Sequence, residues 1–332
     1  MYKKTILILG CGSAGKRHAR NFKSLGCCVS GVDPRLDRLE EFRSIHKNTS
    51  VYNDINQALS DNIEFDGAVV ASPPLYHVNQ AITLLESGIP VLLEKPASND
   101  LNTALELMVA VQETEVPLLL GYTYRWWPPL KKVKDIISMG TIGNLKHVRM
   151  SMSAHLADWH PWENYQEFFM SSKELGGGAI LDESHWIDLM LWFMGMPEKL
   201  FGRVEKISNL EIDTDDNVDI FAIYDDLRVI IHLDLYGRPH EKSIRFSGDE
   251  GTLIWTMEPN RIKLGNDSNE KWDITNFDCK RNDMFLNLAR EFLQIIDGLN
   301  EQFCSIEDGV NVLRIIDSVM KSCRQERVVT IQ

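Results

Sequence analysis

The chain has 332 residues, enough for two domains, because single hydrophobic cores usually stop growing near about 250–300 residues. No window approaches the roughly 18 consecutive apolar residues of a membrane helix, so no membrane partner is expected. The formal net charge of −13 argues against a nucleic-acid partner, since phosphate binding needs clustered lysine and arginine. The six cysteines lack metal-type CxxC spacing, which suits buried thiols in a reducing cytoplasm.

The first 122 residues alternate short apolar runs with segments of helix length. The runs lack a strict two-residue alternation, which indicates parallel strands covered on both faces. They are TILIL (5–9), CVSGV (28–32), GAVVAS (67–72), PVLLEK (90–95) and PLLLGY (117–122), with helices predicted at about 14–25, 54–60, 75–88 and 99–114. This rhythm predicts a doubly wound α/β domain over residues 1–122, with right-handed crossovers.

Residues 123–332 show a different pattern, in which apolar and polar residues alternate between turn signals. The pattern predicts a second α/β domain with a large, open, mostly antiparallel sheet. The expected strands lie in 145–156, 199–207, 218–224, 227–236, 242–248 and 251–257, and the expected helices near 129–138, 282–298 and 306–323. The stretch 211–226 holds seven acids and no base, and we expect a loop followed by an exposed strand there.

A glycine-rich turn, GCGSAG, follows the first strand and opens the first helix. Its three glycines (Gly10, Gly12, Gly15) suit a tight turn, close approach of the backbone to a pyrophosphate, and close packing of helix on strand. The phosphates would then lie at the helix N-terminus, formed by Ser13 and Ala14, where unpaired N–H groups point outward. The sequence therefore predicts a dinucleotide site.

Asp33 ends the second strand, eighteen residues after Gly15. Its carboxylate could accept hydrogen bonds from the adenosine ribose and would repel a 2′-phosphate, which favours NAD. Arg35 keeps NADP open, because a guanidinium at that position could pair with such a phosphate.

Two further strands end in polar loops, which in an open α/β sheet line the ligand crevice. The loop ASPPLYH (71–77) supplies Ser72 and Pro73 beneath the nicotinamide ribose, and His77 is either a contact or a helix-surface residue. EKP (94–96) supplies Glu94 and Lys95 as cofactor contacts, and it places Lys95 at the reacting centre as well. The Lys95 ammonium could polarise a substrate hydroxyl and stabilise the alkoxide that develops as hydride leaves.

The segment LGGGAILDESHWIDLMLWFMG (175–195) predicts one helix after three glycines, on which Asp182 and His185 share a face. A histidine titrates near neutral pH and could take the hydroxyl proton, while a nearby carboxylate orients its ring. A structural histidine is the alternative for His185 taken alone.

Aromatic and polar residues between 124 and 165 suit recognition of a carbohydrate. Indole rings stack on sugars, and six of the eight tryptophans lie between 126 and 192. The stretch 155–165 predicts an irregular loop over the crevice. The substrate-binding candidates are Tyr124, Arg125, Trp127, His155, Asp158, His160, Trp162 and Tyr165, together with Lys95 and His185. The histidines and Asp158 match no common zinc spacing, so we expect no metal.

Taken together and in order, the motifs resemble the Gfo/Idh/MocA family of oxidoreductases over essentially the whole chain. The segments that carry the resemblance are GCGSAGKRH, ASPPLYH, EKP, GYTYRWWP, the GTIG turn and GGGAILDESHWIDL. The resemblance implies an N-terminal Rossmann domain and a C-terminal domain of residues 123–332 whose open sheet lines the substrate site. It also implies a homodimer or homotetramer formed through that sheet, and a cis Lys95–Pro96 bond.

The same resemblance implies the chemistry. Many such enzymes oxidise or reduce a sugar or cyclitol carbon with NAD(P), and the lysine of EKP and the later histidine serve the reacting hydroxyl. The usual spacing from aspartate to histidine is four positions, whereas Asp182 and His185 are three apart, which rotates Asp182 relative to the ring. We therefore expect a dehydrogenase for a sugar, sugar derivative or nucleotide sugar. Alternatives are an NAD-dependent glycosidase that oxidises C3 transiently, and a non-catalytic NAD-binding sensor.

Overall fold

The computed structural model describes residues 3–159, 164–266, 271–300 and 302–331. The chain separates into two compact units, and each unit is assembled from two segments. Unit 1 comprises Met1–Thr123 with Arg281–Val310, and unit 2 comprises Tyr124–Lys280 with Asn311–Gln332. The sequence placed residues 281–310 in the second domain, whereas here they pack with the first.

Helix α9 (Asn282–Ile296) explains why residues 281–310 join unit 1. Phe292 of α9 meets Phe22 edge to face, and a Cβ on Gly67 would lie 2.7 Å from the Ile296 side chain. Amphipathic spacing predicts that such a helix has a buried face, but not which sheet that face covers.

Unit 1 contains a six-stranded parallel sheet in the order β3-β2-β1-β4-β5-β6, as predicted for a doubly wound fold. Its strands are β1 (Thr5–Leu9), β2 (Cys28–Val32), β3 (Val51–Tyr52), β4 (Gly67–Val70), β5 (Val91–Leu93) and β6 (Leu118–Leu120). The sequence missed β3, which has two residues, and α2 (Leu36–Ile45), which is rich in charge and buries only Leu39 and Phe42.

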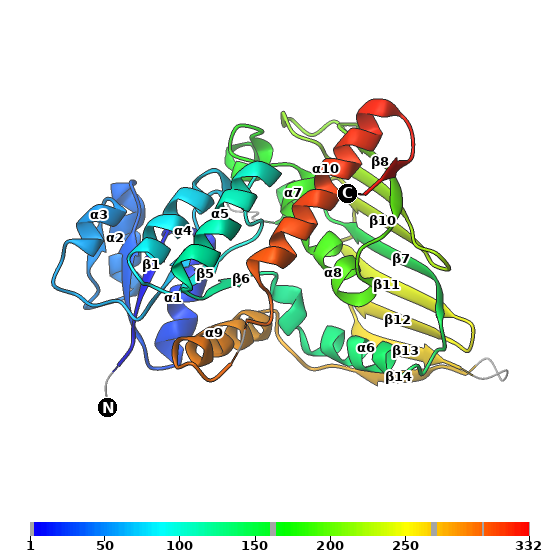
Figure 1. The fold of residues 1–332 in the computed structure, drawn as a ribbon, viewed down its shortest axis with the longest axis horizontal. Coiled ribbons are helices and arrows are strands. Elements are labelled where there is room, and N and C mark those ends of the chain that lie inside the picture. The colour runs from blue at the N-terminus through cyan, green and yellow to red at the C-terminus, as the bar shows by residue number, and fades with distance from the viewer. Residues whose placement is uncertain (1–2, 160–163, 267–270, 301, 332) are drawn as a thin grey trace. The chain divides into compact units, whose positions relative to one another are not determined.

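Helices cover both faces of the parallel sheet. Helix α4 (His77–Glu86) packs with α5 (Leu101–Thr114), while α1 (Ser13–Ser24) packs with α9 (Figure 1). Right-handed crossovers that run in opposite directions from β1 and β4 place these two pairs on opposite faces. Two short helices, α3 (Ile55–Leu59) and η1 (Pro74–Tyr76), complete the connections.

Unit 2 contains a nine-stranded sheet in the order β14-β13-β12-β11-β7-β10-β9-β8-β15, in which β7 and β10 are the parallel pair. The mostly antiparallel character is as predicted. The strands are β7 (Leu145–Ser153), β8 (Lys199–Glu205), β9 (Asn217–Ile223), β10 (Arg228–Asp234), β11 (Glu241–Gly248), β12 (Thr252–Met257), β13 (Asn260–Gly265), β14 (Asp273–Asn276) and β15 (Val329–Thr330). The sequence missed the last three, which lie at the two edges of the sheet.

Helices cover one face of this sheet, which we call the inner face. They are α6 (Pro128–Ser138), α8 (His185–Met194) and α10 (Ile306–Gln325), of which α10 begins in unit 1. Phe193 of α8 packs on Phe246 of β11, and the Val319 side chain of α10 lies against Gly202 of β8. Figure 1 shows these helices on the same side of the strands.

The opposite, outer face of the sheet keeps much of its surface exposed. Strand β9 illustrates the division, because Val218, Ile220 and Ala222 are buried while Asp219 and Phe221 are exposed. The prediction of an exposed strand after the acidic loop was therefore only half right. Alternate side chains of β9 face the helices that cover the inner side of the sheet, so these side chains join the core.

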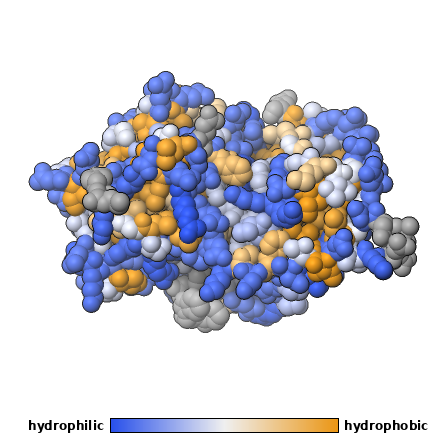
Figure 2. All heavy atoms as spheres, turned by 90° about the horizontal axis from the view of Figure 1, so that it is seen from below, coloured by the Kyte–Doolittle hydropathy of each residue, from blue (hydrophilic) through white to orange (hydrophobic). Residues whose placement is uncertain are grey.

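No helix in the described ranges is both long enough and apolar enough to cross a membrane. Figure 2 shows one face of the molecule, on which hydrophilic residues surround scattered apolar patches. Some apolar surface of this kind is normal on folded proteins.

Candidate active site

The glycine-rich turn between β1 and α1 has glycine where the backbone itself demands it. Gly10 has a φ of +87°, and a Cβ there would lie 2.7 Å from the Ala71 carbonyl oxygen. A Cβ on Gly15 would lie 1.8 Å from the Gly10 carbonyl oxygen, far inside van der Waals contact. The tight turn and the close packing of helix on strand predicted from these two glycines are therefore geometric requirements of the fold.

Gly12 differs from the other two glycines. Its φ is −73°, and the nearest atom to a Cβ placed there is the end of the flexible Arg38 side chain, at 3.3 Å. Neither sterics nor backbone conformation within the described chain demands a glycine at this position. A small residue there leaves the backbone of the α1 N-terminus open to a phosphate, so the turn fits a pyrophosphate.

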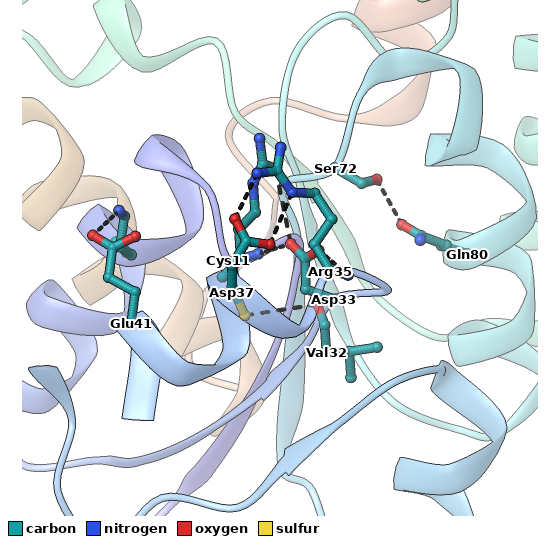
Figure 3. A network of polar contacts seen from close by, with 10 residues as sticks. Cys11, Val32, Asp33, Arg35, Asp37, Glu41, Ser72 and Gln80 are labelled. Carbon is teal, nitrogen blue, oxygen red and sulfur yellow. Dashed lines mark hydrogen bonds and ion pairs between the residues drawn. The ribbon is translucent and has the colours of Figure 1, made fainter. Parts of the chain in front are cut away.

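Asp33, directly after β2, binds the backbone of the glycine-rich turn. Its carboxylate accepts hydrogen bonds from the backbone N–H of Cys11 at 2.8 Å and of Arg35 at 3.0 Å (Figure 3). The residue is only 3% exposed. Because a carboxylate can accept about four hydrogen bonds, two acceptor positions remain for ribose hydroxyls.

The two arginines after Asp33 have different surroundings. Arg35 forms a two-point ion pair with Asp37, with Nε–Oδ1 at 3.1 Å and Nη2–Oδ2 at 2.6 Å (Figure 3). Arg38 lies over Gly12, and its Nη1 is 3.9 Å from Asp33 Oδ2. The sequence pointed to Arg35 as the nearby cation, but Arg38 is the guanidinium beside the turn. Arg38 lies within α2, six residues after the end of β2, and the sequence gave no signal for it.

The loop after β4 supplies Ser72, Pro73 and His77, and it packs directly against Gly10. Ser72 donates a hydrogen bond from its hydroxyl to Gln80 Oε1 at 2.7 Å (Figure 3). His77 is 1% exposed, so it is not a helix-surface residue. Its ring nitrogens lie 2.8 Å from the carbonyl oxygens of Pro96 and Ser72, and burial lowers its pKa. His77 thus joins two loops of the site from the interior.

EKP follows β5 at the same edge of the sheet, and the Lys95–Pro96 bond is cis, as expected. Lys95 is half-buried. The Glu94 carboxylate lies 2.6 Å from Nε2 of the buried His18 on α1. The sequence predicted Glu94 as a cofactor contact and did not predict this link to α1, because a pairing 76 residues apart has no local signature.

In unit 2, the segment after the three glycines forms two helices, where the sequence predicted one. Helix α7 (Ala179–Asp182) ends at Asp182, Glu183 and Ser184 form a turn, and His185 begins α8. The expectation that Asp182 and His185 share one helical face was therefore wrong. The break coincides with a buried Glu183 carboxylate that accepts a hydrogen bond from Trp186 Nε1 at 3.1 Å.

A buried carboxylate from the acidic loop positions α7. Asp215 accepts a hydrogen bond from the Ile180 N–H at 2.9 Å, and its carbonyl oxygen accepts one from Ala179. Burial raises the pKa of Asp215. Gly178 adjoins it with a φ of +111°, and a Cβ there would meet the carboxylate. The acidic stretch thus carries a structural role that its composition did not reveal.

Two consecutive predicted residues, Tyr124 and Arg125, hold helix α8. The Tyr124 ring packs on the His185 ring with centroids 4.9 Å apart. Arg125 donates hydrogen bonds to Asp188, from Nε at 3.1 Å and from Nη2 at 2.7 Å, and both residues are buried. Arg125 was expected to bind substrate, whereas its guanidinium is engaged by this carboxylate one turn after His185.

Lys242 on β11 is a polar residue of this site that the sequence did not indicate. Its ammonium donates a hydrogen bond to the Tyr124 hydroxyl at 2.8 Å and lies 5.5 Å from the ring centroid. Lys242 is buried, at 8% exposure. Lys242 takes an inner-face position of β11, where the alternation of apolar and polar residues predicts an apolar side chain. This exception to the pattern could have indicated a functional residue from the sequence.

The remaining substrate candidates are scattered within unit 2. Trp127 is buried, His155 Nδ1 accepts the Ala157 N–H at 3.3 Å, and the Tyr165 hydroxyl accepts the Glu211 N–H. Asp158 pairs with Arg238 on the surface, and this pairing lowers the pKa of its carboxyl. His160 and Trp162 lie outside the described residues. None of the described side chains in the chain forms a group of three or more metal-ligating residues.

Two family models match this chain. "Oxidoreductase family, NAD-binding Rossmann fold" covers residues 4–122, and "GFO/IDH/MocA C-terminal domain" covers residues 130–254. The chain belongs to the Gfo/Idh/MocA family of oxidoreductases. This membership confirms the resemblance drawn from its motifs, and it identifies the six-stranded unit as an NAD-binding Rossmann fold.

Several known proteins are similar to this family member. It is 28% identical over 201 residues to the uncharacterized oxidoreductase sll0816 of Synechocystis, an alignment covering 59% of this chain and about half (53%) of that protein. It is 23% identical to myo-inositol 2-dehydrogenase of Thermotoga maritima, with 98% of each chain covered. Levoglucosan dehydrogenase, solved with NADH, shares the fold with a TM-score of 0.88 at 17% identity over 100% of both chains.

Proposed function

We propose that this protein is an NAD-dependent dehydrogenase or reductase acting on a CH–OH group of a sugar, a sugar derivative or a nucleotide sugar. The observation that carries the proposal is the glycine-rich turn, in which Gly12 is small without any steric need and Asp33 retains acceptor capacity. The similarity to myo-inositol 2-dehydrogenase and to levoglucosan dehydrogenase supports a polyol or sugar substrate.

In this proposal, bound NAD supplies the hydride chemistry and the chain's own residues manage the substrate oxygen and its proton. Lys95 steadies negative charge on the oxygen, and His185 takes or returns the hydroxyl proton. Asp182 orients the imidazole from the preceding helix. Because His185 begins α8, its ring orientation depends on the turn that separates it from Asp182 and on the Tyr124 ring packed against it.

The proposed cofactor preference is NAD over NADP. Asp33 places a buried carboxylate where a 2′-phosphate would be repelled, and Arg35 is engaged by Asp37. Arg38 is the cation closest to this carboxylate, so it is the residue through which NADP use would be regained. Steady-state rates with both cofactors, on the wild type and on Asp33→Ser, test this preference.

The decisive experiment is a panel of sugars, polyols, uronic acids and nucleotide sugars, followed by the absorbance of reduced cofactor. Lys95→Ala and His185→Ala are each expected to lower turnover by about a thousandfold while NADH affinity stays within about twofold. Because the two residues serve one step, the double variant should lose little more than either single variant. Wild-type rates in both single variants would refute the assignment. Release of a leaving group without net NADH would instead indicate the glycosidase.

We further propose that the outer face of the nine-stranded sheet joins two or four copies of the chain. Arg149 and Arg245 are direct partners across β7 and β11, both are exposed, and like charges at such a position destabilise an isolated sheet. Exposed Asp219 on β9 offers the complementary charge on a second copy. Sedimentation analysis of Arg149→Glu/Arg245→Glu should show dissociation, whereas Arg290→Glu on α9 should not.

The proposed compartment is the reducing cytoplasm. All six cysteines lie in the described part of the chain and are free thiols. Burial and the Asp33 carboxylate raise the pKa of the Cys11 thiol, in the glycine-rich turn, to about 12, which keeps it protonated and unreactive.

A further inference from the structure

The histidine that ends the motif GCGSAGKRH has no role in the chemistry proposed above. His18 lies on α1 and is completely buried. Its Nε2 is 2.6 Å from Oε1 of Glu94, the first residue of EKP. This hydrogen bond therefore connects the helix that begins at the glycine-rich turn with the turn that carries Lys95.

The direction of this hydrogen bond follows from the chemistry of the two groups. An ionised carboxylate only accepts, so Nε2 of His18 must carry the proton. The other ring nitrogen, Nδ1, is buried and has no hydrogen-bond partner in the described part of the chain. The ring packs edge to face on Phe285 of α9, with centroids 6.1 Å apart. The imidazole is thus held by one polar contact and one aromatic contact.

Glu94 lies among three groups that favour its ionised form. Burial opposes ionisation, but the hydrogen bond from His18 and the charges of His18, Lys95 and Arg17 outweigh it and lower the pKa of Glu94. The Arg17 guanidinium lies 4.5 Å from the Phe285 ring centroid. The carboxylate also accepts the Lys95 backbone N–H at 3.3 Å. Loss of the His18 donor would therefore leave a partly buried carboxylate less satisfied, beside two cations.

We propose that His18 is a positioning residue. Through Glu94 it fixes the EKP turn, and with it the place and charge environment of Lys95, relative to the helix that starts at the dinucleotide turn. The effect of His18 on catalysis by Lys95 rests on the proposed function. The hydrogen bond between His18 and Glu94 does not depend on that function. The two parts of the proposal are therefore tested separately.

The first experiment needs neither substrate nor cofactor. Long-range ¹H–¹⁵N spectra of histidine-labelled wild-type protein should show His18 protonated at Nε2, with assignment from His18→Gln. An Nδ1-protonated ring lacking the Nε2 proton would overturn the proposal. The protonated nitrogen is read from the wild type, and the variant serves only to assign the His18 signal.

The second experiment measures Glu94 in variants with ¹³C-labelled glutamate, assigned by Glu94→Gln. His18→Leu removes the donor, and the pKa of Glu94 should rise by about one pH unit or more. His18→Gln keeps a donor near the Nε2 position and should restore most of that difference. His46→Leu is the matched control, because His46 is a buried histidine of the same unit that packs on Phe42. An unchanged pKa of Glu94 in His18→Leu would contradict the proposal.

The third experiment asks whether the contact matters for catalysis. His18→Leu is expected to lower kcat by about tenfold or more with less than about threefold change in KM for NAD, and His18→Gln should recover most of the rate. Equal losses in both variants, or a change confined to thermal stability, would reduce His18 to a packing residue. If the wild type binds no NADH, the proposed function fails while the first two experiments still decide the hydrogen bond.

Discussion

The two units hold their candidate site residues in different ways. In unit 1, the dinucleotide turn is made of backbone, and its shape depends on two glycines that no side chain could replace. In unit 2, His185 and its neighbours are held by side-chain pairs, namely Arg125 with Asp188 and Lys242 with Tyr124. A turn whose shape depends on its own glycines tolerates substitutions of neighbouring residues but not of those glycines. A site built from pairs depends on residues far apart in the sequence.

The largest effect is expected from breaking the buried ion pair of unit 2. Arg125→Met leaves the Asp188 carboxylate buried without its guanidinium, and the free energy of unfolding should fall by about 3–5 kcal/mol. The double variant Arg125→Met/Asp188→Leu should recover much of this loss, since neither charge of this pair is then left in the core. Urea unfolding of the three proteins measures both values. A double variant no more stable than the single one would show that packing, not charge, dominates here.

The corresponding test in unit 1 is Gly15→Ala. The new Cβ would lie 1.8 Å from the Gly10 carbonyl oxygen, so helix α1 must shift, and we expect a loss of about 1–3 kcal/mol of stability. Unlike the ion pair, this loss has no second-site remedy in a side chain, because the clash is with backbone. Urea denaturation compares it directly with Arg125→Met, and a loss below about 0.5 kcal/mol would show that the turn is more adaptable than its geometry indicates.

Gly12→Ala separates the needs of the ligand from those of the fold. The added Cβ meets only the mobile end of Arg38, so stability should change by less than about 0.5 kcal/mol. Affinity for NADH should nevertheless fall by about tenfold or more, because the methyl group occupies the approach of the pyrophosphate. Fluorescence titration with NADH measures this. Unaltered affinity would mean that the phosphates do not cross Gly12.

This contrast explains how much of the site the sequence could predict. The turn, Asp33 and EKP could be selected from the sequence because their signals lie within a few residues, where glycine placement and strand ends follow local rules. The contact of Glu94 with His18 spans 76 residues, and that of Lys242 with Tyr124 spans 118. Such pairings require knowledge of which elements are neighbours. The helix break after Asp182 was missed because it accompanies the burial of the Glu183 carboxylate, which tertiary packing sets.

Two histidines, one in each unit, also differ in whether backbone or side chains surround them, and their pKa values shift in opposite directions. In unit 1, His77 lies between backbone carbonyls and burial lowers its pKa. In unit 2, hydrogen bonds and charge from Asp234 and Asp219 raise the pKa of His232 to about 9, against the desolvation that opposes it. His232 lies on the outer face of the sheet and is about one third exposed, so solvent screening reduces the energy of this pair.

The sign of the resulting pH dependence follows from the raised pKa of His232. A group whose pKa is higher in the folded state stabilises the fold fully below its unfolded pKa of 6.5, and this contribution is lost as the pH rises through about 9. After screening, we expect a decline of about 1 kcal/mol in the free energy of unfolding between these values. His232→Gln should flatten that part of the urea-derived profile.

His147→Gln is the matched control for this profile. Burial and the charges of Arg149 and Arg245 lower the pKa of His147, so its own contribution changes below pH 6.5 and the decline above that pH should persist. A decline that survives in His232→Gln would place its origin elsewhere, in groups such as lysines that titrate at higher pH. In that case the carboxylates of the outer face would stabilise protonated His232 too weakly to make its effect on stability differ from that of His77 in unit 1.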